Sequence, residues 1–290
     1  AVQQTRLDAF RGARPAMGSE GPIQNPARVR HEAPADWHTG FLPGGLLFTP
    51  LIADPRWPHF AAAYQYYLHD RNLRHAGAVS FGETFTLYRD TLGGAWWELG
   101  LQAGVFAVFD LDSPSSDLVN ADYMGAVVLG FRYKRFSALG RLAHQSSHLG
   151  DEFLLRNRVN RINLSYESVD LKLSYEFFGD VLRLYAGGGY LFHRDPESLH
   201  PGSLQWGIEG RSPWPGPHVW YRPLVAIDVQ HREENDWHVD VSLRTGVEIA
   251  GVLGDRKLQL LIEYFRGHSP NGQFYREQVD YLGVGAHFHF

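Results

Sequence analysis

A histidine, a serine and an asparagine occur close together between residues 136 and 167. His144 and Ser146 are separated by one residue, and Asn160 follows in the same segment. A serine hydroxyl becomes a nucleophile when a base removes its proton, and the base needs a partner that fixes its tautomer. Ser146 is therefore a candidate nucleophile, with His144 as its base and Asn160 as the group that orients the base.

This chemistry requires the three side chains to share one face of a β-sheet. Apolar residues alternate with others over 136–142, which predicts a strand with one lipid-facing side, and Arg141 points away from that side. Residues i and i+2 of a strand point the same way, about 7 Å apart. Continued alternation therefore places His144 and Ser146 on the outer, lipid-facing wall.

A second run precedes residue 168 and brings in the asparagine. Its apolar face consists of Ile162, Leu164 and Tyr166. Pairing Leu142 with Ile162 would put His144 opposite Asn160, with Cβ atoms about 5 Å apart. A β-bulge near Ser146 would break this arrangement, since bulges are frequent at barrel rims.

The composition restricts the class of protein. The chain has 290 residues, no cysteine, 14% aromatic and 20% charged residues, and a net charge of -5. Abundant aromatic residues argue against disorder, and the negative charge argues against nucleic-acid binding. The absence of cysteine excludes disulfides and thiolate metal sites. No stretch has the roughly 18 to 20 apolar residues of a membrane helix, so a β-barrel is the membrane class that fits.

Long alternating segments support a transmembrane barrel. They lie at 94–109, 168–179, 181–193, 236–250 and 255–267. They have 12 to 16 residues each, whereas strands of globular proteins usually have about 5 to 6. Charges on one face of nearly every segment would be ruinous in a sandwich core, but they can pair or meet water in a barrel lumen.

The order of these segments predicts an all-β fold, an antiparallel barrel of about twelve strands over residues 59–290. Thirteen strand-like runs are visible, so the run at 59–67 either lies outside the barrel or is misread. The alternating last ten residues end in Phe290. This ending resembles the C-terminal strand by which bacterial outer-membrane barrels are recognised for insertion.

Residues 1–58 differ from the rest of the chain. They hold half of the 16 prolines, which cannot donate to a sheet ladder. We expect an N-terminal extension that is a periplasmic arm, a plug of the lumen or a poorly ordered lead-in. The first residue is Ala1, so we take the chain to be exported, with its signal peptide cleaved.

The segment around His144 and Ser146 resembles outer-membrane phospholipase A, with Asn160 and Arg161 matching the start of that family's next strand. The resemblance implies a site on the outer wall of a twelve-stranded barrel. It departs where Ser147 and His148 replace an Asn-Gly pair. The family's active form is a calcium-dependent dimer, which implies Ca²⁺ as cofactor and a homodimer as partner.

The oxygen ligands nearest to this segment are Asp151 and Glu152, which alone do not define a calcium site.

A second resemblance covers more of the chain and concerns a bacterial family named only as a domain of unknown function, number 1207. The segments that carry it are FDLDSPSSDLVNADY, HQSSHLGDEFLL, INLSYES and SPNGQFY, together with the ending. Members of that family look like outer-membrane proteins. This resemblance supports the fold and a bacterial outer-membrane location and implies no activity.

Two functions stay open. In the first, the chain is a lipid acyl-ester hydrolase of the phospholipase A or lipid A deacylase type, acting on membrane lipid. In the second, it is a non-catalytic barrel with a structural, partner-binding or small-pore role, whose partner is another envelope protein. Counting back eight strands from Phe290 favours the second, because it puts His144 at the periplasmic rim.

Overall fold

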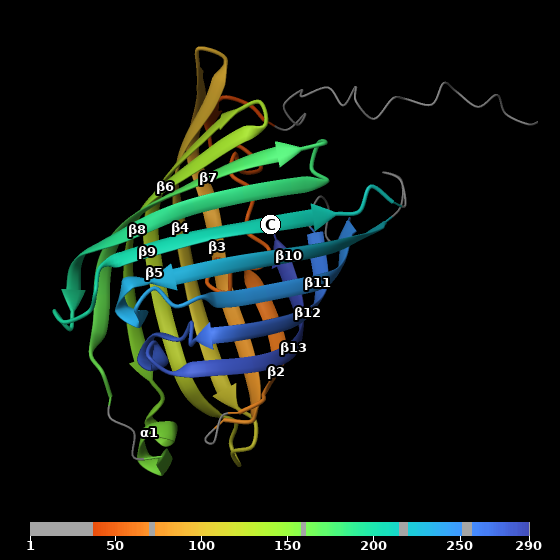
Figure 1. The fold of residues 1–290 in the computed structure, drawn as a ribbon. Coiled ribbons are helices and arrows are strands. Elements are labelled where there is room, and N and C mark those ends of the chain that lie inside the picture. Colours follow the sequence, from red (N-terminus) through yellow and green to blue (C-terminus); the bar gives the residue numbers. More distant parts are fainter. Residues whose placement is uncertain (1–36, 70–72, 158–160, 215–219, 251–256, 290) are drawn as a thin grey trace, which may run out of the picture. The chain divides into compact units, whose positions relative to one another are not determined.

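A closed ring of twelve antiparallel strands forms the body of the protein in a computed structural model, which describes residues 37–69, 73–157, 161–214, 220–250 and 257–289 (Figure 1). The ring strands are β2 Phe60–Tyr67, β3 His75–Leu92, β4 Ala95–Asp110, β5 Asp117–Tyr133, β6 Phe136–Leu149, β7 Leu164–Phe177, β8 Leu182–Asp195, β9 Gly202–Arg211, β10 Tyr221–Arg232, β11 Asp240–Ala250, β12 Lys257–His268 and β13 Gln278–His289. Each pairs with its neighbours in sequence, and β2 closes the ring against β13. The predicted barrel is confirmed.

Two details of the predicted strand order are wrong. The run at 59–67 is not outside the barrel, because it forms β2, which pairs with both β13 and β3. The runs at 157–167 and 168–179 are not two strands, because one strand, β7, crosses their boundary. Residues before Leu164 belong to the connection that carries the helix α1, Asp151–Asn157.

This correction reverses the predicted direction of β6. We call the end of the barrel where β13 ends the C-terminal rim, and the opposite end, near α1, the loop rim. With β7 counted once, β6 and β13 run in opposite directions, so β6 ends at the loop rim. The predicted position of His144 near the C-terminal rim is therefore wrong.

Connection lengths agree with this orientation. The C-terminal rim has the shortest connections, 93–94, 134–135 and 178–181, and the loop rim has the longest, 150–163, although 212–220 at the C-terminal rim is as long as 269–277 at the loop rim. In outer-membrane barrels the short turns are periplasmic and the long loops are extracellular. The loop rim is thus the end that corresponds to the cell exterior in this type of fold.

The two walls of the barrel differ as the alternation predicts. The outer wall exposes large apolar side chains, including Leu142 and Leu171. The inner wall buries charges that pair with one another, such as Arg89 with Glu98 and Arg183 with Glu209. The polar faces of 168–179 and 236–250 point inward as expected, since Lys172, Asp240, Arg244 and Glu248 are all buried.

A segment before β2, residues 43–59, runs through the lumen; we call it the lumen segment. Its backbone forms hydrogen bonds with side chains of strands around the ring. The N–H of Leu47 donates to Glu98 at 2.9 Å, and the N–H of Ile52 donates to Glu209 at 2.8 Å. Arg244 Nη1 donates to the Ile52 carbonyl at 2.7 Å. Contacts with β4, β9 and β11 at once require an interior position. Of the predicted extension, residues 1–36 lie outside the described part.

Apolar side chains fix the lumen segment. Phe48, Leu51 and Trp57 are buried and form one cluster with wall residues such as Leu139 and Tyr185. A short strand, β1 Gly40–Phe41, precedes the lumen segment and pairs with β3. Proline at 50, 55 and 58 suits this irregular backbone, which needs no ladder hydrogen bonds.

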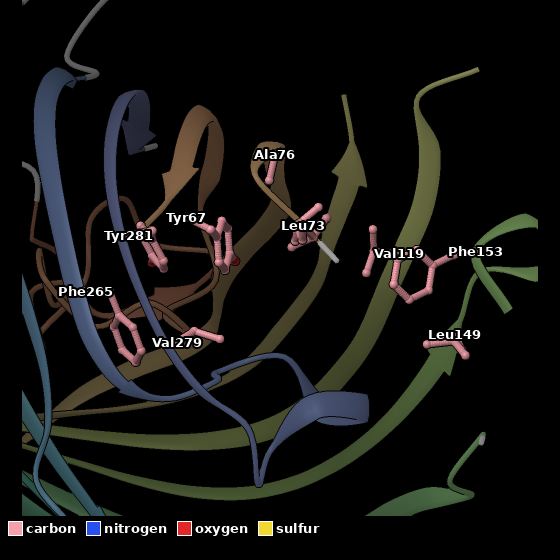
Figure 2. Close-up of a cluster of buried hydrophobic side chains, with 10 residues drawn as sticks. Tyr67, Leu73, Ala76, Val119, Leu149, Phe153, Phe265, Val279 and Tyr281 are labelled. Carbon is pink, nitrogen blue, oxygen red and sulfur yellow. The ribbon is translucent and has the colours of Figure 1, made fainter. Parts of the chain in front are cut away.

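A second apolar cluster closes part of the loop rim (Figure 2). Phe153 of α1 is 2% exposed and contacts this cluster beside Val119 and Leu149, while Tyr67 and Tyr281 lie on its other side. The connection between β6 and β7 is thereby held against the barrel. Among the described residues, no helix has the length and apolar character needed to span a membrane.

Candidate functional site

Strand β6 presents His144 on the outer wall and Arg141 to the lumen. The His144 side chain is 54% exposed, and Leu142 on the same face is equally exposed at 54%. Ser146 follows on that face and is half-buried. Arg141 donates through Nε to both oxygens of Asp170, at 3.0 and 2.9 Å, on the inner side. His144 and Ser146 thus share the outer face of β6 near the loop rim.

The predicted register between β6 and the next strand is wrong. Leu142 lies opposite Val169, not Ile162, and His144 lies opposite Glu167, not Asn160. Asn160 itself falls in 158–160, outside the described residues. The described residues that follow it, 161–163, precede β7.

The predicted register is wrong because the apolar side chains before Glu167 pack against the loops and do not face lipid. Leu164 is 4% exposed and clusters with Leu199 and Tyr275 of the loops, with Ile162 packed against them. Gln273 also binds Ile162, accepting from its N–H at 3.1 Å and donating to its carbonyl at 2.9 Å. These apolar residues therefore point inward, under the loops.

The outer face of β7 follows the opposite parity. Val169, Leu171 and Leu173 are 41–51% exposed, and the same alternation continued backward reaches Glu167. This alternation is the signal in the sequence that identifies Glu167 as an outer-wall residue. It is hidden when the run at 157–167 is treated as a strand of its own.

Glu167 connects two histidines on the outer wall, and we call the three residues the His144–Glu167–His193 cluster. His144 Nδ1 lies 2.9 Å from Glu167 Oε1. His193 Nδ1 forms a short hydrogen bond with Glu167 Oε2. Both carboxylate oxygens are therefore occupied, one from β6 and one from β8.

A bulge in β8 turns His193 outward. Glu167 pairs with His193 and Ser168 pairs with Leu191, so Phe192 has no partner in the ladder. Such an extra residue re-aims the side chains that follow it. The His193 side chain is 78% exposed, compared with 33% for that of Glu167.

The other side of His144 is open. Its partner in β5 is Gly125, and a Cβ added to that glycine would meet no atom within 4 Å. Tyr123 lies opposite Ser146 and its ring packs edge-on against His148, with centroids 5.6 Å apart. A ligand on the outer wall can thus reach the imidazole of His144 from the β5 side.

The hydrogen bond to Glu167 suits His144 to act as a base. A carboxylate accepts, so Nδ1 carries the proton when the ring is neutral, and Nε2 keeps its lone pair. This is the tautomer in which a histidine can take a proton from a serine hydroxyl. Ser146, two residues along the same face, is the nearest serine in sequence that could supply it.

The carboxylates suggested as calcium ligands do not form a cation site by themselves. Asp151 and Glu152 occupy the first turn of α1 and are exposed. Within the described residues, no group of three or more His, Asp, Glu or Cys side chains could hold a metal ion. In the described part of the chain, Asp151 and Glu152 thus supply two of the six to eight oxygen ligands that Ca²⁺ takes.

The chain belongs to the family described as "Protein of unknown function (DUF1207)", whose model matches residues 2–290. A comparison with curated proteins gives no significant match. The resemblance to this family noted from the sequence is confirmed.

Solved structures of outer-membrane barrels resemble the whole barrel. Outer-membrane phospholipase A from Escherichia coli is 14% identical, covers 83% of this chain and 93% of its own, and has a TM-score of 0.58. An outer-membrane phospholipase dimer from Salmonella typhi with bound calcium is 13% identical, covers 81% and 94%, and has a TM-score of 0.57. At this identity the likeness shows the fold.

Proposed function

We propose that this member of the DUF1207 family is an outer-membrane barrel that hydrolyses acyl esters of membrane lipids. Ser146 is the nucleophile and His144 the base; Asn160, the orienting residue that the resemblance to outer-membrane phospholipase A implies, lies outside the described residues. The observation that carries the proposal is the outward position of His144 and Ser146 in the loop-rim half of β6, next to the exposed apolar side chain of Leu142. The substrate is a phospholipid or a lipid A ester that arrives laterally.

The depth of the cluster fits a lipid ester. A cationic side chain on the lipid face costs about 2–4 kcal/mol at the midplane but only about 0–1 kcal/mol near the interface. His144 is the ninth of the fourteen residues of β6, so it lies in the half of the strand toward the loop rim and its interface. Ester groups of lipids also lie at this depth, between the acyl chains and the headgroups.

The reaction follows from the groups present. Ser146 Oγ attacks the ester carbonyl carbon while His144 Nε2 takes the hydroxyl proton. The same proton then passes to the leaving alkoxide, which departs as an alcohol and leaves an acyl-enzyme. Water, deprotonated by His144, hydrolyses the acyl-enzyme to a fatty acid and restores the serine.

Calcium and a second copy of the chain belong to the proposal only through the resemblance. The Salmonella typhi structure is described as a dimer with bound calcium. Asp151 and Glu152 are not joined by a third candidate ligand among the described residues, so no step of the reaction is assigned to calcium. We include calcium as a variable in the test.

The test measures ester hydrolysis by the full chain in detergent micelles, with and without Ca²⁺. We expect Ser146→Ala to reduce the rate by about 10³-fold or more, because the nucleophile is lost. Ser165→Ala is the matched control, since Ser165 is half-buried in β7 opposite Ser146. Equal rates for wild type and Ser146→Ala in both conditions would exclude the hydrolase.

The alternative is a non-catalytic barrel, and the lumen segment bears on which kind. Backbone groups of Leu47 and Ile52 are bound to opposite parts of the wall, and Trp57 is 1% exposed. This filling of the lumen favours a structural or partner-binding role over a pore. Purified protein in planar bilayers should then show no steady conductance.

A further inference from the structure

We infer that Glu167 is the residue that positions His144, and that His193 in turn positions Glu167. This inference rests on the proposed function, because it assigns both residues to the proposed hydrolysis. In the proposed hydrolysis Ser146 acts on the substrate, His144 acts on Ser146, Glu167 positions His144, and His193 positions Glu167.

The backbone sets the first contact. His144 and Glu167 are directly opposite one another on adjacent antiparallel strands, where Cβ atoms are about 5 Å apart. The 2.9 Å bond between Nδ1 and Oε1 therefore needs no flexible loop to form it. A partner on a strand holds a catalytic side chain more rigidly than a partner on a loop.

The carboxylate of Glu167 supplies a negative charge next to His144, which a side-chain amide could not supply. When Ser146 gives its proton to Nε2, the His144 ring becomes an imidazolium. An ionised carboxylate beside Nδ1 stabilises that cation, as the aspartate of a serine triad does. An asparagine at this position would fix the tautomer but would supply no negative charge.

The second oxygen of Glu167 is held by His193. With Oε1 bonded to His144 and Oε2 to His193, rotation of the carboxylate would break both bonds. The bulge at Phe192 is what brings His193 to this place. The groups around the carboxylate are thus His144 from β6, His193 from β8 and, across His144, Gly125 of β5.

Stability gives no reason for this arrangement. The three side chains are 54%, 33% and 78% exposed, and ion pairs at such positions contribute little to folding. Their neighbours on the outer wall, Leu142 and Val169, are apolar. A cluster that stabilises little and departs from the apolar pattern fits a role in chemistry.

The first experiment reads the tautomer of His144 and does not depend on activity. Nitrogen-15 NMR of the full chain in micelles, assigned with His144→Ala, should show a protonated Nδ1 in wild type. In Glu167→Ala the proton should move to Nε2, the form favoured by a free imidazole. An unchanged tautomer in Glu167→Ala would overturn the inference, whatever the protein hydrolyses.

The second experiment separates charge from orientation. In Glu167→Gln the amide oxygen still accepts from Nδ1, so folding and KM should stay near wild type while kcat falls about 10²-fold or more. Loss of the negative charge should also move the acidic limb of the kcat/KM profile to lower pH. Glu176→Gln, a carboxylate of the same strand paired with Arg132 on the inner wall, is the matched control.

The third variant tests His193. His193→Ala should lower kcat less than Glu167→Ala, because it loosens the carboxylate without removing it, and His193→Gln should restore part of the loss. If Ser146→Ala abolishes hydrolysis while Glu167→Gln keeps the wild-type rate and pH profile, the inference fails and the proposed function stands. If Ser146→Ala hydrolyses like wild type, the proposed function fails, and the positioning roles of Glu167 and His193 fail with it.

Discussion

Two polar pairs on β6 and β7 lie three residues apart and face opposite sides of the barrel wall. Arg141 and Asp170 form the inner pair, each side chain 12% exposed, and Arg141 also donates to Gln102 at 3.1 Å. His144 and Glu167 form the outer pair, with side chains 54% and 33% exposed. Both pairs are directly opposite in the same ladder.

The difference lies in what each pair is needed for. Inside, Asp170 is paired with both Arg141 and Lys172 in a crowded, charged lumen, so removing one of the three charges upsets the balance of the other two. On the outer wall, Leu142 and Val169 flank the pair, and apolar residues in place of His144 and Glu167 would keep the wall equally stable. Polar pairs on the inner wall are therefore explained by structure, whereas the outer pair calls for a function.

The largest expected effect that distinguishes the outer pair from the inner pair is a loss of hydrolytic activity. His144→Ala should lower ester hydrolysis by about 10³-fold or more and change the free energy of unfolding by less than about 0.5 kcal/mol. Hydrolysis assays and urea unfolding in micelles measure the two quantities. His148→Ala is the control on the same face of β6, and an equal loss of activity there would contradict a specific role for His144.

The lumen segment should show the reverse pattern. Trp57 is 1% exposed and contacts a cluster of wall residues, so Trp57→Ala should cost about 3–5 kcal/mol of unfolding free energy through the cavity it leaves. Hydrolysis per folded molecule should stay at the wild-type value. A variant that unfolds like wild type would show that the lumen segment adds nothing to barrel stability.

The inner pair gives the next test. Arg141→Ala should destabilise the barrel by about 3 kcal/mol, because Asp170 loses the Arg141 Nε–H that donates to both of its oxygens. The double variant Arg141→Leu with Asp170→Leu should recover only part of that loss, because Lys172 then loses Asp170 as its ion-pair partner. Urea unfolding compares the three proteins, and lost hydrolysis without lost stability would break the contrast between the walls.

The smallest effect concerns a pair at the C-terminal rim, formed by Asp180 in the turn between β7 and β8 and Arg222 of β10. Partial burial alone would raise the pKa of Asp180, but the hydrogen bonds and charge of Arg222 hold that pKa below its usual value. A lowered pKa in the folded state means stability that is present above about pH 4 and is lost as the pH falls through the folded pKa. Since Asp180 is 59% exposed, Asp180→Asn should cost only about 0.5 kcal/mol at pH 7. Urea unfolding at pH 7 and pH 3 should show this difference shrinking at the lower pH.

The sequence predicted the barrel, the inward charges and the outward face of β6, because alternation reports directly which residues share a wall. It misplaced the partner of His144, because alternation does not report where a strand leaves the apolar belt. In β7 the residues before Glu167 turn an apolar face to the loops, with Leu164 clustered under Leu199, so alternation predicts a second strand where one strand continues.

The position of the lumen segment could not be predicted for a comparable reason. Its contacts join Ile52 to Glu209 and Arg244, which no local pattern could indicate. Proline at 50, 55 and 58 excluded a strand but was compatible with an arm, a plug or a lead-in. Irregular backbone carries no period, so its position emerges only from tertiary contacts.

The position of the lumen segment also restricts the order of assembly. The segment is continuous with β2, and β2 joins β13 at the seam that closes the ring. Its hydrogen bonds span sequence separations of 157 and 192 residues, and contacts of such long range form slowly. If the seam closed first, the segment would have to be threaded into a ring already formed. We therefore expect β2 to pair with β13 only after the segment has entered the lumen, and a chain stalled before that pairing would expose two unpaired sheet edges.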